Sequence, residues 1–143
     1  MTGACSGAEK TLIVAGTDDP CGPAERKTPA ELIADIRAEA GEAAFLLLLT
    51  HRNDQLPQWS ALGVQAVLAG HCHGGVVRLP FVGGLFGTDR RLFPAWDAGL
   101  YRQGETVLYV SRGLGYTNVH FRLFNRPEVA VIVLRRGSPA INS

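Results

Sequence analysis

Short apolar runs alternate with helical patterns in the first half of the chain. Three runs are almost wholly apolar, which is typical of strands in the interior of a sheet, and they cover residues 11–16, 43–51 and 64–71. The middle run is apolar throughout, so we expect its strand to be buried on both faces. The alternation of strand and helix predicts an α/β fold.

Two helices are predicted between these runs. In "TPAELIADIRAEAG", Thr28 is a good N-cap, proline follows it, and Glu31 completes a capping box. Gly41 marks the expected end of this helix. The stretch "LPQWSALG" predicts a second, shorter helix over about residues 56–62.

The second half of the chain has a different pattern. Residues 80–99 are rich in glycine and aromatic residues, which predicts a long, partly ordered loop. Alternating runs at residues 105–113 and 128–136 predict strands of a more antiparallel closing portion. The length favours one single domain over residues 1–143, and residues 137–143 are expected to be its frayed tail.

The composition is that of an ordinary soluble globular protein. The chain has 143 residues, 46% hydrophobic and 19% charged, and a formal net charge of +1. That charge gives no bulk attraction to nucleic acids or anionic membranes, and we expect no nucleic-acid partner. Three cysteines cannot all pair within one chain, and their spacing matches no zinc finger, so reduced thiols are predicted. The first ten residues lack the pattern of a signal peptide.

Histidines follow two of the predicted strands. His51 ends the second apolar run, and "AGHCHGG" follows the third, which is where α/β sheets place their ligand sites. If "GHCH" continues the strand direction, His71 and His73 point one way and Cys72 points the other. Three imidazoles suit zinc, iron, manganese or nickel, whereas Cys72 is expected to be a small buried hydrophobic residue.

Other polar residues leave two interpretations open. A histidine after a strand also serves as a capping or core-edge residue, and His120 is interpreted as structural or surface-exposed. Asp18 and Asp19 in "GTDDP" are either acid–base groups or carboxylates that close a turn. The turn is favoured, because Asx residues before proline commonly close turns.

Four stretches together resemble a known family. "LLLLTHRND", "VLAGHCHGGVVRLP", "GLYRQGETVLYVSRGLG" and "RLFNRPEVAVIVL" are similar to the C-terminal half of calcineurin-like metallophosphoesterases, in particular a bacterial branch with "GHTHGGQ" and "LYVSRGLG". The resemblance spans residues 12–134. It implies the C-terminal half of a four-layer αββα sandwich, with a two-metal centre at the strand ends.

The resemblance also implies roles for individual residues. His51 and His71 match ligands of the second metal, His73 matches a ligand of the first, and the metals would be manganese, iron or zinc. Arg112 or Arg122 would meet the substrate phosphate. For both arginines, a solvated or carboxylate-paired side chain is the favoured alternative.

The sequence departs from the family pattern in several places. The upstream ligand motifs D-x-H, G-D and G-N-H-E or G-N-H-D do not occur in it, Val76 stands in place of a usual glutamine, and Asn53 in place of a common proline. We interpret the chain as a truncated C-terminal portion with little or no phosphoesterase activity on its own. The alternatives are a non-catalytic metal-binding or interaction module and an inactive gene fragment.

The implied substrates and location remain broad. The resemblance implies phosphate esters or lipid-linked pyrophosphates as substrates. It implies a cytoplasmic or membrane-associated enzyme, because many relatives carry an N-terminal membrane anchor.

Overall fold

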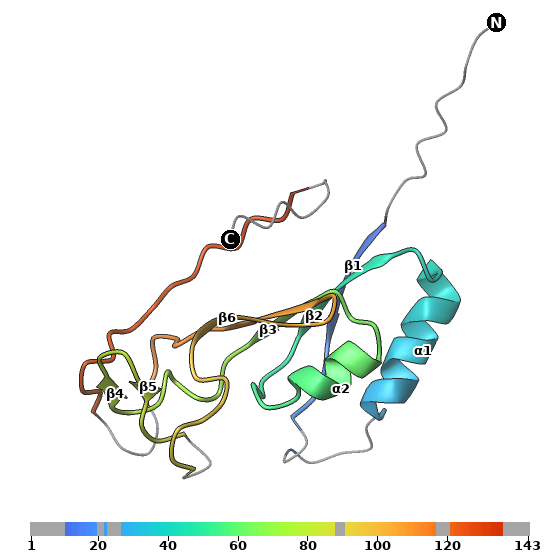
Figure 1. The fold of residues 1–143 in the computed structure, drawn as a ribbon. Coiled ribbons are helices and arrows are strands. Elements are labelled where there is room, and N and C mark those ends of the chain that lie inside the picture. Colours follow the sequence, from blue (N-terminus) through green and yellow to red (C-terminus); the bar gives the residue numbers. More distant parts are fainter. Residues whose placement is uncertain (1–10, 20–21, 23–26, 88–90, 117–120, 136–143) are drawn as a thin grey trace, which may run out of the picture.

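The computed structural model describes residues 11–19, 22, 27–87, 91–116 and 121–135, which form a mixed α/β fold (Figure 1). Its main element is a five-stranded sheet in the order β1-β2-β3-β7-β6. The strands of this sheet are β1 (Leu12–Gly16), β2 (Phe45–Leu49), β3 (Ala66–Ala69), β6 (Gly99–Gln103) and β7 (Thr106–Val110). Two helices connect the first three strands: α1 (Pro29–Ala40) and α2 (Leu56–Ala61). Strands β1, β2, β3 and β7 are parallel, and β6 is antiparallel to β7. The predicted α/β class is confirmed at this level.

Helix α1 begins and ends where the sequence predicts. The Thr28 side chain accepts a hydrogen bond from the backbone N–H of Glu31, and the Glu31 carboxylate accepts one from the backbone N–H of Thr28. The backbone N–H of Gly41 donates to the carbonyl of Arg37, and Gly41 has φ of 83°. Of the helices in the described ranges, none is long and apolar enough to cross a membrane.

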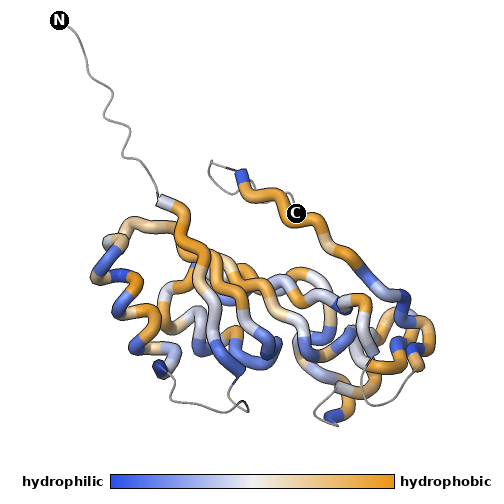
Figure 2. The backbone as a smooth tube through the Cα atoms, turned by 180° about the vertical axis from the view of Figure 1, so that it is seen from behind, coloured by the Kyte–Doolittle hydropathy of each residue, from blue (hydrophilic) through white to orange (hydrophobic). Residues whose placement is uncertain are grey.

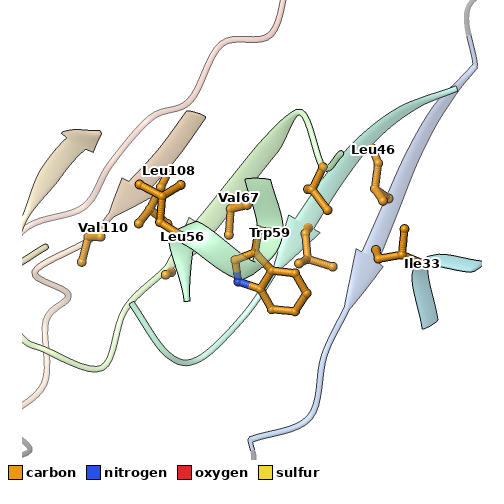
Figure 3. Packing of buried hydrophobic residues seen from close by; sticks show 10 residues of the cluster. Ile33, Leu46, Leu56, Trp59, Val67, Leu108 and Val110 are labelled. Atoms are coloured by element: carbon orange, nitrogen blue, oxygen red, sulfur yellow. The ribbon is translucent and has the colours of Figure 1, made fainter. Parts of the chain in front are cut away.

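One face of the sheet carries the hydrophobic core. Both helices lie on this face (Figure 1), and Ile33 of α1 and Trp59 of α2 pack against it. The strand residues beneath them alternate along each strand, and Figure 3 shows Leu46, Val67, Leu108 and Val110 among them. These residues are buried, because helix and sheet side chains interlock at this interface.

The other face of the sheet is apolar and exposed. The strand register places Leu12, Val14, Phe45, Leu49 and Leu100 on it. Leu12 is 50% exposed, Val14 57% and Leu100 71%. The prediction that the second strand is buried on both faces is confirmed only at the centre of β2, where Leu47 on this face is 8% exposed; Phe45 and Leu49 at its ends are 38% and 44% exposed.

The predicted strand at residues 128–136 is absent from the described part of this segment. Residues 128–135 run as an extended chain without strand pairing, and residue 136 lies outside the described ranges. Figure 2 shows the segment as an apolar stretch apart from the sheet. Val131 is 85% exposed. The alternating pattern is that of a strand, but a strand needs a partner for its backbone hydrogen bonds. The N–H of Glu128 donates to the carbonyl of Gly113, and beyond it no described strand pairs with the segment.

The region after β3 combines short pairings with a hairpin. Strands β4 (Arg78–Leu79) and β5 (Gly83–Gly84) form a two-stranded sheet inside the glycine-rich region. The strand predicted at residues 105–113 is confirmed over Thr106–Val110. Its hairpin partner β6 was not predicted from the sequence. Residues 88–90 of the predicted loop at 80–99 and the predicted tail at 137–143 lie outside the described ranges.

The two faces of the sheet should respond differently to the same substitution. Leu48 is fully buried in the core, whereas Leu12 is half exposed on the open face. We expect Leu48→Ala to lower the free energy of unfolding by about 2–5 kcal/mol and Leu12→Ala by less than about 1 kcal/mol. Urea denaturation followed by tryptophan fluorescence measures both, and equal losses would contradict a one-sided core.

Candidate functional site

Three polar side chains meet where parallel strands end. Asp19 follows β1, His51 follows β2 and His71 follows β3. The Nε2 atom of His51 lies 2.8 Å from Nδ1 of His71 and 3.4 Å from Oδ2 of Asp19. The two imidazole rings meet edge to face, with centroids 4.6 Å apart. The structure thus brings together two of the three predicted histidines, together with a carboxylate.

Backbone pairing continues beyond β2 and β3 and holds the two histidines side by side. The N–H of Thr50 donates to the carbonyl of Leu68, and the N–H of Gly70 donates to the carbonyl of His51. Because the ladder extends to these residues, the positions of His51 and His71 follow from the strand register.

The "HCHGG" stretch is a turn, so the condition that it continues the strand direction is not met. Strand β3 ends at Ala69, and His71 and His73 have positive φ angles of 66° and 50°. Gly74 and Gly75 follow with φ of 74° and 69°. These left-handed backbone angles turn the chain away from the direction of β3.

This turn separates the side chains of the motif. Cys72 is buried and only 2% exposed, whereas His71 and His73 are half-buried at the rim. Cys72 forms no disulfide within the described residues. The Nδ1 atom of His73 lies 3.5 Å from Nη2 of Arg122. The ring nitrogen of His73 therefore faces a guanidinium, while His51 and His71 face each other.

Burial lowers the pKa of both histidines of the turn. For His71 the main cause is burial, followed by the nearby His51 and Arg52. For His73 burial is again first, followed by Arg122. A pKa below the ordinary 6.5 keeps both imidazoles neutral at pH 7, which is the form that binds a metal ion.

The described residues do not fit a complete two-metal centre. A pair of metal ions needs an oxygen ligand that bridges them in addition to separate ligands for each. Within the described ranges, no three His, Cys, Asp or Glu side chains are arranged to hold a metal ion. His51 and His71 instead share a hydrogen bond. These side chains can supply neutral nitrogen ligands for part of such a centre.

One residue distant in sequence and one nearby residue hold the turn in place. The side-chain amide of Asn125 donates to the carbonyls of His73 and Gly75 at 2.7 and 3.2 Å. The guanidinium of Arg78 donates to the carbonyl of Gly74 at 2.8 Å. Asn125 is buried, so these bonds lie away from water. Sequence reasoning missed both residues, although each lies within a quoted motif, "GHCHGGVVRLP" or "RLFNRPE".

A buried carboxylate supports Arg78 in turn. Asp97 accepts hydrogen bonds from Arg78 and from the Tyr101 hydroxyl, both at 2.7 Å, and from the backbone N–H of Gly84. Burial raises the pKa of the Asp97 carboxyl, but the hydrogen bonds from Tyr101 and Gly84 and the charge of Arg78 outweigh burial and leave the pKa lowered. The carboxylate is therefore charged at neutral pH.

The two candidate phosphate-binding arginines have partners. Arg112 forms an ion pair with Glu128, with Nε and Nη2 at 2.7 and 2.6 Å from the same carboxylate oxygen. Arg122 donates to backbone carbonyls, including that of Arg112 at 2.8 Å, and stacks near the Tyr116 ring. This is the carboxylate-paired geometry for Arg112, and its role toward substrate stays a prediction.

The structure describes two of the remaining candidates, Asp18 and Asp19. Asp18 is exposed, and the backbone carbonyl of Asp19 accepts a hydrogen bond from the N–H of Gly22. The carboxylate of Asp19 lies beside His51, and its part in closing a turn stays a prediction. His120 lies outside the described residues.

Known proteins with similar sequences share one description. The chain is 35% identical over 91 residues to the uncharacterized metallophosphoesterase YkuE of Bacillus subtilis, which covers 64% of this chain and 31% of YkuE. It is 31% identical over 125 residues to the uncharacterized metallophosphoesterase Cj0846 of Campylobacter jejuni, which covers 87% of this chain and 32% of that protein. Part of this chain is homologous to bacterial metallophosphoesterases.

A third relative has a more specific name. Phosphodiesterase YaeI of Escherichia coli is 37% identical over 90 residues, which covers 62% of this chain and 32% of YaeI. The chain spans about a third of the length of these three curated relatives. No protein-family profile matches the chain, and no solved structure matches it.

Two glycines with the same backbone angle provide a test of the turn. Gly75 has φ of 69° and Gly63 has φ of 68°, but a Cβ on Gly75 would lie 2.7 Å from the Cα of Gly84, whereas nothing lies within 4 Å of a Cβ on Gly63. We expect Gly63→Ala to lower the free energy of unfolding by about 1 kcal/mol. Gly75→Ala should lower it by about 2 kcal/mol more, because the backbone of Gly84 must move to make room for the Cβ. Chemical denaturation measures both, and equal costs would refute the close approach.

The lowered pKa of Asp97 predicts a pH dependence. A charged Asp97 stabilises the fold at pH above its ordinary pKa of 3.8, and this contribution is lost as the pH falls through the lower pKa of the folded state. Asp97→Asn should therefore lower the free energy of unfolding by about 1–3 kcal/mol at pH 7, and by progressively less below about pH 4.

The exposed pair of Asp35 with Lys27 supplies the control for this prediction. Asp35→Asn should change the free energy of unfolding at pH 7 by less than about 0.5 kcal/mol. Urea titrations at pH 7 and pH 3 compare the variants. A loss of unfolding free energy in Asp97→Asn that is the same at both pH values would contradict a stabilising charge on Asp97.

Proposed function

We propose that this chain is the C-terminal portion of a metal-dependent phosphoesterase domain that hydrolyses phosphoric esters or pyrophosphates. The contact between His51 and His71 at the ends of parallel strands carries this proposal, because neighbouring imidazoles at that edge suit a metal ion. The partial homology to metallophosphoesterases supports it. In this proposal His51, His71 and His73 are metal ligands, and the other ligands come from another part of the domain.

The residues of this chain would have defined tasks in that domain. His71 and His73 offer neutral ring nitrogens, since their pKa values are lowered. Asn125 and Arg78 hold the carbonyls of the turn and so fix where the two rings lie. Two divalent ions, when bound by a complete set of ligands, would neutralise phosphoryl charge and lower the pKa of a bound water.

The open face of the sheet supports the view that part of the domain lies elsewhere. Leu12, Val14 and Leu100 are exposed on a continuous apolar surface, and residues 129–134 add further exposed apolar side chains. In a β-sandwich, a second sheet packs about 10 Å away on such a face. We infer that the remainder of the domain supplies this second layer and pairs with the extended segment.

A chimera tests this proposal. The region of phosphodiesterase YaeI that matches this chain is replaced by the corresponding residues of this chain, and hydrolysis of bis-p-nitrophenyl phosphate is measured with manganese. We expect activity in the chimera and none in the isolated chain. His71→Ala and His73→Ala in the chimera should each lower kcat/KM by roughly 100-fold or more, because a metal ligand is lost.

Cys72 is the matched control, because it lies between the two histidines in the same turn. Cys72→Ala should keep hydrolysis within about threefold of the unmodified chimera, since its thiol is directed away from the rim. Circular dichroism and metal content are measured for each variant. A folded chimera that remains active without His71 and His73 would refute the proposal, and so would robust turnover by the isolated chain.

A further inference from the structure

Exposed apolar side chains gather at the end of the molecule that carries the β4–β5 hairpin. Figure 1 shows this hairpin at the opposite end of the molecule from α1. At its tip, Leu79, Phe81 and Val82 are exposed, and Phe81 is exposed completely. Pro80 is exposed as well, so the tip presents four consecutive apolar residues to solvent. Turns of soluble proteins ordinarily expose polar residues, so this tip indicates a partner.

Two neighbouring segments bring further apolar residues to the same end. The N–H of Arg78 in β4 donates to the carbonyl of Leu123, and the N–H of Phe93 donates to the carbonyl of Leu85, directly after β5. The exposed apolar residues that this pairing gathers are Phe86, Leu92, Phe93, Phe121, Leu123 and Phe124. Together with residues 79–82 they form the apolar end of the molecule.

Three phenylalanines of the apolar end have left-handed backbone. The φ angle is 66° at Phe81, 51° at Phe93 and 53° at Phe124. Such angles are costly for a residue with a Cβ, and glycine or asparagine would adopt them more readily. All three rings are exposed, so they add little packing to the chain itself. Neither the turns nor the core therefore accounts for aromatic residues at these positions.

The charge of this end indicates the kind of partner. Residues 77–98 and 121–127 contain five arginines and two aspartates, a formal excess of three positive charges that the net charge of +1 for the whole chain conceals. Within the described part of these segments, the one acidic residue, Asp97, is buried and bonded to Arg78. Arg126, two residues after Phe124, is exposed. An anionic partner is therefore favoured.

We propose that the apolar end docks on the surface of an anionic lipid bilayer. Apolar and aromatic side chains enter the boundary between headgroups and acyl chains, while arginines meet the lipid phosphates. In this docking Phe81 enters the acyl region and Arg126 contacts the headgroups. A bilayer accepts side chains from separate loops without a complementary shape, which suits the irregular loops of this end. The docking uses side chains of this chain and needs no N-terminal anchor.

The hairpin also touches the turn that carries the candidate ligands. A Cβ on Gly75 would lie 2.7 Å from the Cα of Gly84, and Arg78 donates to the carbonyl of Gly74. Docking through the apolar end would therefore bring the rim with His73 close to the lipid headgroups. Neither metal ions nor hydrolysis take part in this docking, so it is independent of the proposed function.

Flotation of the complete chain with lipid vesicles tests this docking. Vesicles of equal parts phosphatidylglycerol and phosphatidylcholine are compared with vesicles of phosphatidylcholine alone. We expect the chain to bind the anionic vesicles roughly tenfold more tightly or better, because arginines are attracted to anionic headgroups. Raising sodium chloride from about 0.1 to about 0.5 M should weaken this binding, because salt screens the charges. Equal binding to both kinds of vesicle would overturn the proposal.

Two serine variants locate the apolar contact. Phe81→Ser should weaken binding to the anionic vesicles by roughly tenfold or more, since a ring is lost from the acyl region. Leu100→Ser is the matched control, because Leu100 is exposed on the open face of the sheet. It should change the Kd by less than about twofold. Equal losses in the two variants would assign the binding to the open face and overturn the proposal.

Two arginine variants test the contact with the headgroups. Arg126→Gln should weaken binding to the anionic vesicles by about fivefold. Arg102→Gln, an exposed arginine on β6, should leave the Kd unchanged. Circular dichroism checks that each variant is folded. Equal effects of the two substitutions would refute the contact at Arg126.

A second copy of this chain and the remainder of the domain are the other occupants that this end could have. Self-association in sedimentation velocity that Phe81→Ser abolishes would assign the end to a second copy. A folded chimera with YaeI that binds anionic vesicles equally with and without Phe81→Ser would assign it to the remainder of the domain. Either result would overturn docking on lipid, whereas a loss of vesicle binding with Phe81→Ser in both proteins supports it.

Discussion

Parallel pairing of β1, β2 and β3 is the constraint on which the candidate site depends. Each of these strands ends at the same edge, so the residues that follow them meet without any direct sequence signal for the contact. The hydrogen bond from the N–H of Gly70 to the carbonyl of His51 extends this pairing to the histidines. A shift of β3 by one residue relative to β2 would turn His71 to the other face of the sheet.

The same pairing explains why the core is one-sided. Helices α1 and α2 both return on one face, and Trp59 and Leu48 are buried there. The strands nevertheless carry apolar residues on both faces, which is the pattern of a sheet between two layers. The extended segment beyond Glu128 also alternates like a strand, and it pairs with none of the described strands. Both features agree with the proposal that the remainder of the domain supplies a second layer.

Local signals predicted the elements well, and long-range contacts decided the remainder. The capping box of Thr28 and Glu31 involves neighbouring residues, so the sequence alone locates the start of α1. The apolar runs locate β1, β2 and β3 for the same reason. The turn at His71 and His73 depends on Asn125, which lies 52 residues beyond His73, and on Arg78 of β4, which folds back onto Gly74. Residues 128–135 have the alternation of a strand, but a strand forms only beside another strand, and the sequence pattern does not identify that neighbour.

The candidate site divides between two parts of the chain with different tasks. The three candidate ligand histidines lie between His51 and His73, at or just beyond strand ends that the core fixes. The groups that hold the turn, Asn125, Arg78 and Asp97, all follow it in sequence. The bonds of Asn125 and Arg78 to the turn end at carbonyl oxygens and not at imidazole nitrogens. The second half of the chain therefore acts as a support for histidines supplied by the first, and a polypeptide that ended after "HGG" would carry the candidate ligands without the contacts that hold the turn.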